Sequence, residues 1–143
     1  MKVNLNDYSY DYGTAVSRPT ASEFGRTFIL DNKSKYIAKK WAIDKVVFRG
    51  KINERCDYLI EIDGNRYYWV ELKGKDLKKA CCQLLNTLEI VDTSNAKIQE
   101  ARIITTKTNK IDIRTIEYQK LDKLMGKTGG RLKTYTNQGS ETI

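Results

Sequence analysis

The sequence predicts an α/β fold, and three local patterns support that class. Two runs rich in Tyr, Ile, Leu, Val and Trp flank the turn from Asp63 to Asn65, which is typical of a β-hairpin. Apolar residues then recur at spacings of three and four from Leu77 to Leu88, as on one face of an α-helix. A strand pattern at 101–108 precedes a second helical pattern. Strands and helices therefore alternate along the chain.

The length and composition favour a single domain. A chain of 143 residues with 40% hydrophobic residues has the size of one compact unit with one core. We therefore expect one domain over 1–143. Residues 1–19 lack a clear period and are expected to form an irregular arm, and residues 136–143 are expected to fray.

The segments before the hairpin give weaker signals. Thr20 is of a residue type that caps helices, and Glu23, three residues later, would complete a capping box at the start of a short helix. Residues 26–32 indicate a short strand. The β-forming stretch 36–48 predicts one bent strand, or two strands with a break near Asp44.

The segments after the hairpin are more regular. Asp76 is placed to cap a helix that runs to about Val91. A strand is expected at 101–108, a helix at 114–126 and a last strand at 131–135.

Charge and composition restrict the function. The formal charge is +8, and the stretch from Lys33 to Arg55 holds eight Lys and Arg residues, which favours a polyanionic partner such as nucleic acid. Histidine is absent, so imidazole-based catalysis and His-ligated metal centres are excluded. Any catalysis must rely on carboxylates and lysine.

The cysteines and the hydropathy pattern point to a reducing compartment. The three cysteines are an odd number and suit neither a disulfide framework nor a four-ligand zinc site. No run of about twenty apolar residues exists, and the N-terminus has no signal-peptide character. We expect a cytoplasmic protein with no membrane association.

The hairpin geometry brings two acids together. If the loop is Asp63 to Asn65, Asp57 lies directly opposite Glu71, with Cβ atoms about 5 Å apart. Lys73 follows on the same face. The other face, which includes Ile60 and Val70, is apolar and is expected to pack on the helix.

Two opposed carboxylates repel each other, so folding alone does not favour this pair. A divalent cation bound between them would replace this repulsion with attraction, since Mg²⁺ binds one or two carboxylates and keeps several waters. Lys73 would then orient or deprotonate a bound water or stabilise the charge growing on a phosphate. The alternative is ordinary surface ion pairing of Asp57 with Arg55 or Arg66, and of Glu71 with nearby lysines.

At these residues the chain resembles the PD-(D/E)xK nucleases, the restriction-endonuclease-like superfamily that includes Holliday-junction resolvases. The matching stretches are "CDYLIEI", "VELKG" and "ACCQLL", roughly Cys56 to Leu85. The resemblance implies an αβββαβ core with a mixed central sheet flanked by helices. This chain departs from the fullest motif because Cys56, not proline, precedes Asp57.

The resemblance also implies the site. Asp57, Glu71 and the carbonyl of Leu72 would bind Mg²⁺ or Mn²⁺, and Lys73 would be the catalytic lysine. Gln83 matches a helix glutamine of many members, although an exposed helix amide explains it equally. Glu23 is the candidate for an additional acid from the first helix, although a capping role also accounts for it.

The resulting expectation is a small Mg²⁺-dependent nuclease acting on DNA more readily than RNA. Tyr67 and Trp69 would stack on bases, although packing is the commoner role of strand aromatics. A homodimer is a further expectation, because cleavage of two strands needs two sites. The alternative is a non-catalytic nucleic-acid-binding or protein-interaction module on the same scaffold. The residues expected to hold the phosphate backbone are Arg55, Lys75, Lys78, Lys79, Lys39 and Lys40.

Overall fold

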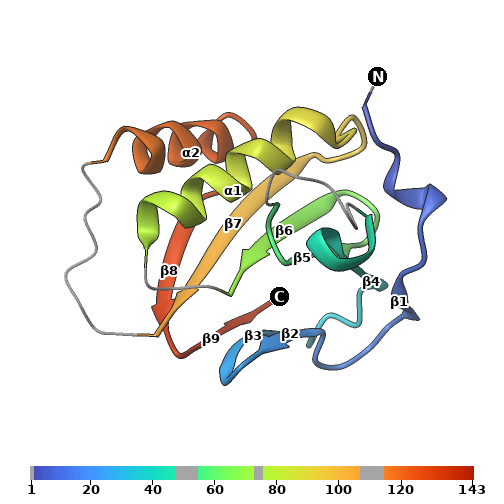
Figure 1. Ribbon diagram of the computed structural model, residues 1–143. Coiled ribbons are helices and arrows are strands. Elements are labelled where there is room, and N and C mark those ends of the chain that lie inside the picture. The colour runs from blue at the N-terminus through green and yellow to red at the C-terminus, as the bar shows by residue number, and fades with distance from the viewer. Residues whose placement is uncertain (1, 48–54, 73–75, 107–114) are drawn as a thin grey trace.

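The computed structural model describes residues 2–47, 55–72, 76–106 and 115–143. These residues form three layers. Figure 1 shows two helices on one face of a large sheet and a small sheet on the opposite face. None of the helices in these ranges is long and apolar enough to cross a membrane.

The large sheet has six strands and is mixed. Its first four strands pair antiparallel, and its last two run parallel to the fourth. The α/β class with a mixed sheet is therefore confirmed. In sheet order the strands are β1 (Asp11–Thr14), β4 (Ala38–Ala42), β5 (Tyr58–Ile62), β6 (Arg66–Glu71), β7 (Ile98–Thr105) and β8 (Leu132–Thr136).

The small sheet corrects two predictions. It contains β2 (Thr20–Glu23), β3 (Arg26–Asp31) and β9 (Gln138–Thr142), with β2 antiparallel and β9 parallel to β3. The segment expected to be a short helix is thus β2, because its alternate residue Ala21 is buried opposite Phe28. The tail expected to fray is β9, which is held along the free edge of β3.

The N-terminal segment is also more ordered than expected. It holds a short 3₁₀ turn, η1 (Leu5–Asp7), and β1 pairs with β4. The N–H of Val3 donates to the carbonyl of Ile90, 2.7 Å away. Contacts with distant segments supply the order that the local pattern lacks.

Both predicted helices are present. They are α1 (Leu77–Ile90) and α2 (Ile116–Gly126). The Asp76 side chain accepts a hydrogen bond from the N–H of Lys79 at 3.0 Å, so the predicted cap of α1 is confirmed.

The hairpin has the predicted register. Ile62 pairs with Arg66 and Tyr58 with Val70, and the loop holds three residues. Asp63 and Gly64 adopt positive φ angles of 54° and 74°. Aspartate and glycine tolerate this left-handed conformation, so the turn composition fixed the register.

The packing of the hairpin faces is the reverse of the prediction. The face with Ile60, Tyr68 and Val70 packs on the small sheet, in one core with Phe28. The face with Trp69 packs on the two helices. Both faces are apolar, so alternation separated them but did not identify their partners.

The chain breaks its extended path near Asp44, as predicted. After β4 it forms a π-helical turn, η2 (Ile43–Val47). This turn lies next to the start of β5, because the N–H of Ile43 donates to the carbonyl of Asp57 at 2.9 Å.

Candidate metal and catalytic site

Asp57 and Glu71 converge on one backbone amide. The N–H of Leu72 donates to Oδ2 of Asp57 at 2.7 Å and to Oε1 of Glu71 at 3.0 Å. Those two oxygens are therefore no farther apart than these two bonds together. Asp57 is 6% exposed and Glu71 is fully buried. Two acidic side chains thus lie together at the edge of the core, within reach of one cation.

Backbone contacts hold Asp57 in this position. It lies in a bend just before β5, and its carbonyl accepts from Ile43 of η2. The N–H of Arg55 donates to Oδ1 of Asp44 at 3.2 Å. The π-helical turn therefore fixes the segment that carries the first acid, and such turns recur at functional sites.

Helix α1 fixes the same segment from the other side. The hydroxyl of Thr87 accepts from the N–H of Cys56 at 2.9 Å and donates to the carbonyl of Gln83 at 2.8 Å. Gln83 lies one turn earlier on the same helix and is only 3% exposed. It is therefore not an exposed helix amide, and it remains a candidate for the site.

Cys56 is a packing residue and not a nucleophile. Burial raises the pKa of its thiol well above the usual value, and the negative charge of Glu71 raises it further, while the hydrogen bond with Thr87 opposes the shift. The thiol therefore stays protonated at neutral pH. The three cysteines are all free, as the sequence predicted.

Glu23 reaches the same region, but from a strand. Its carboxylate pairs with the ammonium of Lys45 in η2. The hydrogen bond and the charge of Glu23 raise the pKa of Lys45, with smaller contributions from Tyr58 and Asp57. Lys45 therefore stays protonated and within the electrostatic reach of Asp57. No sequence signal singles out Lys45, because it lies outside the hairpin and matches no motif.

The predicted phosphate contacts fall into different environments. Lys73 and Lys75 lie outside the described residues. Lys78 and Lys79 are exposed on the first turn of α1, and Lys78 lies 3.9 Å from a carboxylate oxygen of Glu117. These two lysines are accessible to a phosphate backbone.

The other predicted contacts are engaged within the fold. Arg55 is only 9% exposed, which does not fit the phosphate contact expected of it. Lys40 donates to the carbonyl of Thr20 at 2.8 Å and lies 3.8 Å from Asp11. Lys39 lies over the ring of Tyr10. Packing of the N-terminal segment on β4 accounts for this engagement of both lysines.

The two aromatic residues expected at nucleobases are buried. Tyr67 is 5% exposed and Trp69 is fully buried in the core beneath the helices. The indole N–H of Trp69 donates to Oε1 of Gln99 at 2.9 Å. Stacking on bases is therefore wrong for these residues, and packing is their role.

The donor set at the acid pair fits a hard divalent cation. Carboxylate and carbonyl oxygens are preferred by Mg²⁺ and Mn²⁺. Asp57 and Glu71 would supply two such ligands, and the carbonyl of Leu72 would be the third. Within the described ranges, no cluster of three or more His, Cys, Asp or Glu side chains is arranged to hold a metal. Water would therefore complete the coordination.

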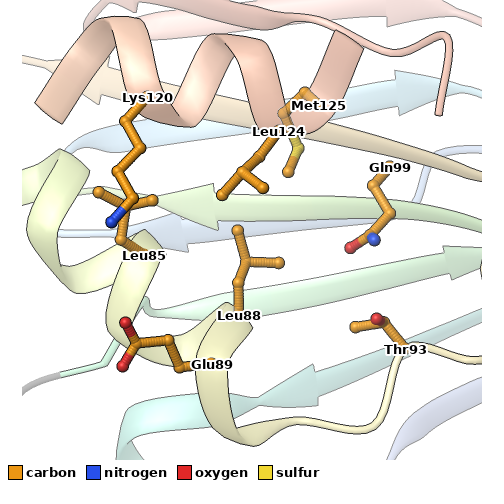
Figure 2. A pocket seen from close by; sticks show the side chains of 8 residues that line it. All are labelled: Leu85, Leu88, Glu89, Thr93, Gln99, Lys120, Leu124 and Met125. Carbon is orange, nitrogen blue, oxygen red and sulfur yellow. The ribbon is translucent and has the colours of Figure 1, made fainter. Parts of the chain in front are cut away.

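A separate apolar pocket lies between the two helices. Its volume is about 260 Å³, and Figure 2 shows Leu88 of α1 and Leu124 of α2 pointing toward each other across it. Glu89 and Lys120 are its charged lining residues. None of the acid-pair residues lines this pocket, so it is distinct from the candidate catalytic site.

Comparisons with family models, with curated proteins and with solved structures find no match to this chain.

Proposed function

We propose that this protein is a small metal-dependent nuclease that hydrolyses phosphodiester bonds of DNA. The observation that carries the proposal is the convergence of Asp57 and Glu71 on the amide of Leu72. Like charges brought together in a buried place destabilise a fold. A divalent cation bound between them converts this repulsion into attraction.

The order of the elements supports the finer fold assignment. Strands β4, β5 and β6, helix α1 and strand β7 follow one another in the chain, which fits the βββαβ part of the restriction-endonuclease-like core. The first helix of that core has no counterpart among the described residues before β4, where η1 is a single 3₁₀ turn. The proposal therefore rests on the later five elements.

Each residue of the site has a distinct role in this proposal. A Mg²⁺ or Mn²⁺ ion, when bound, would supply an activated water and would neutralise charge on the scissile phosphate. Asp57, Glu71 and the Leu72 carbonyl would hold the ion. Lys73 is the proposed catalytic lysine. Lys45 adds a positive charge near Asp57, where it attracts the phosphate.

A cleavage assay tests the proposal. Wild-type protein and the variants Asp57→Asn, Glu71→Gln and Lys73→Ala are incubated with labelled DNA and Mg²⁺, and parallel samples contain RNA. We expect each variant to lose at least about 100-fold of the cleavage rate, because even the loss of a residue that only supports a metal ligand costs about 10- to 100-fold.

Glu61→Gln is the matched control, because Glu61 lies on β5 of the same hairpin but pairs with Tyr67, away from the acid pair. It should cleave at the wild-type rate. Equal rates in all five proteins would refute the proposal. Binding of DNA without cleavage by the wild type in Mg²⁺ or Mn²⁺ would favour the non-catalytic module instead.

A further inference from the structure

A charged pocket borders the first residue of β6, and none of the residues that line it belongs to the acid pair. Its volume is about 440 Å³, which is within the range of ligand sites. Arg66 begins β6 and lines this pocket, whereas Glu71 ends the strand. The rise of a β-strand separates these two ends by about 17 Å. The pocket is therefore distinct from the candidate metal site.

The carboxylates of this pocket are already saturated by internal donors. Oε2 of Glu100 accepts hydrogen bonds from the guanidinium groups of Arg66 and Arg102, both at 3.1 Å. Oε1 accepts from the backbone N–H of Arg131 at 2.7 Å. Glu141 accepts two bonds from Arg102, at 2.6 and 2.9 Å, and one from the hydroxyl of Tyr135. Both carboxylates are therefore already engaged with donors of the fold.

Positive charge remains in excess around the pocket. Four cationic residues line it against these two carboxylates: Arg66, Arg102, Arg131 and Lys133. In the described part of the chain, the side chains of Arg131 and Lys133 form no ion pair. Nε of Arg66 is buried without a hydrogen-bond acceptor among the described residues. The pocket therefore has donors and charge that match an anionic oxygen ligand.

The positive surface continues from the pocket toward α2. Arg131 also lines a neighbouring hollow with Lys123 and Lys127, against the single acid Asp122. One phosphate in the pocket would thus have further cations beside it in the neighbouring hollow. A linear polyanion fits this arrangement better than an isolated phosphate.

We propose that this pocket anchors one phosphate of a nucleic acid strand through Arg66, Arg131 and Lys133, and that the strand continues over Lys127 and Lys123. The anchor requires no metal. It is therefore independent of the proposed nuclease activity.

The test is fluorescence anisotropy of a labelled 20-nucleotide single strand with the full chain in EDTA, at several salt concentrations. The variant Arg131→Gln/Lys133→Gln should bind about 10-fold more weakly. The slope of log affinity against log salt should fall by about 0.7, since one phosphate contact on a single strand contributes about that much. Both side chains are exposed, and melting by circular dichroism should show an unchanged fold.

The control variant Lys33→Gln/Lys120→Gln removes the same charge from exposed positions outside the pocket. It should bind within 2-fold of the wild type. Equal weakening of both double variants would overturn the proposal, because net charge alone would then explain binding. Binding of a labelled free nucleotide without any binding of the strand would also overturn it.

Asp57→Asn separates this proposal from the nuclease proposal. It should bind the strand in EDTA as tightly as the wild type, even where it fails to cleave. Loss of binding in Asp57→Asn equal to that of the pocket variant would contradict a separate anchor.

Discussion

Two pairs of neighbouring acids lie in the fold, and the groups that contact them differ. Glu100 of β7 and Glu141 of β9 both accept hydrogen bonds from the guanidinium of Arg102, which is 1% exposed. Where β6 ends, Asp57 and Glu71 both accept a hydrogen bond from the backbone N–H of Leu72. The first arrangement is a structural ion-pair network around one guanidinium, whereas the second places two carboxylates on one backbone donor. Burial of a carboxylate is thus no evidence of function until its partners are known.

The largest expected effect would break the structural side of this comparison. Glu141→Gln leaves the buried Arg102 with Glu100 as its remaining anionic partner among the described residues. We expect the free energy of unfolding to fall by about 3 kcal/mol, because removing one partner of a buried ion pair is strongly destabilising. Urea denaturation followed by tryptophan fluorescence measures it. A change below about 0.5 kcal/mol would show that the network contributes little.

Metal binding should stabilise the fold through the Asp57–Glu71 pair and not through the Arg102 network. Mn²⁺ at 100 times its Kd should raise the free energy of unfolding of the wild type by about 2.7 kcal/mol. Asp57→Asn should lose this stabilisation, and in EDTA it should be no less stable than the wild type, because one of two repelling charges is gone. Glu141→Gln should retain the Mn²⁺ effect despite its lower baseline. Retention of the full Mn²⁺ stabilisation in Asp57→Asn would show that the metal binds at a place other than the acid pair.

Thr87 tests how rigidly α1 holds the first acid. Thr87→Val removes the acceptor of the Cys56 N–H, which then lies buried and unsatisfied. The expected cost is about 2 kcal/mol of unfolding free energy. If the bond also positions Asp57, the cleavage rate should fall while the melting curve remains cooperative. Thr93→Val, at a partly exposed position after α1, is the control and should change neither quantity.

Acid should weaken the network of Glu141 and Arg102. Burial raises the pKa of Glu141, but the hydrogen bonds from Arg102 and Tyr135 and the charge of Arg102 outweigh it, so the net pKa lies below its usual value of 4.5. The group therefore stabilises the fold above about pH 4.5, and this contribution is lost as pH falls toward the folded pKa. Its slope is at most about 1.4 kcal/mol per pH unit. Denaturation between pH 3 and 7 should show a shallower acid decline in Glu141→Gln than in the wild type.

The hairpin and α1 could be predicted because their signals are local. The turn at Asp63 and Gly64 accepts positive φ, and the two-residue period then fixes which residues face each other. The pairing of Asp57 with Glu71 followed from that register alone. The helix needed only its apolar spacing and the cap at Asp76.

The errors arose where one local pattern fits two structures. Thr20 and Glu23 match a capping box, yet they belong to a strand because Phe28 and the core of the small sheet bury Ala21. The tail from Gln138 to Thr142 has little apolar character, and its partner β3 lies more than a hundred positions earlier. No short window of sequence contains that pairing.

The sequence by itself determined the acid pair, its hairpin and the two helices, because turn chemistry and residue periodicity act between near neighbours. Only the tertiary structure decided which face of the hairpin meets the helices, why Arg55 and Gln83 are buried, and which cation reaches Glu23. These outcomes depend on how layers from distant segments exclude water from one another. The free energy of that burial belongs to the assembled core and to no single stretch of the chain.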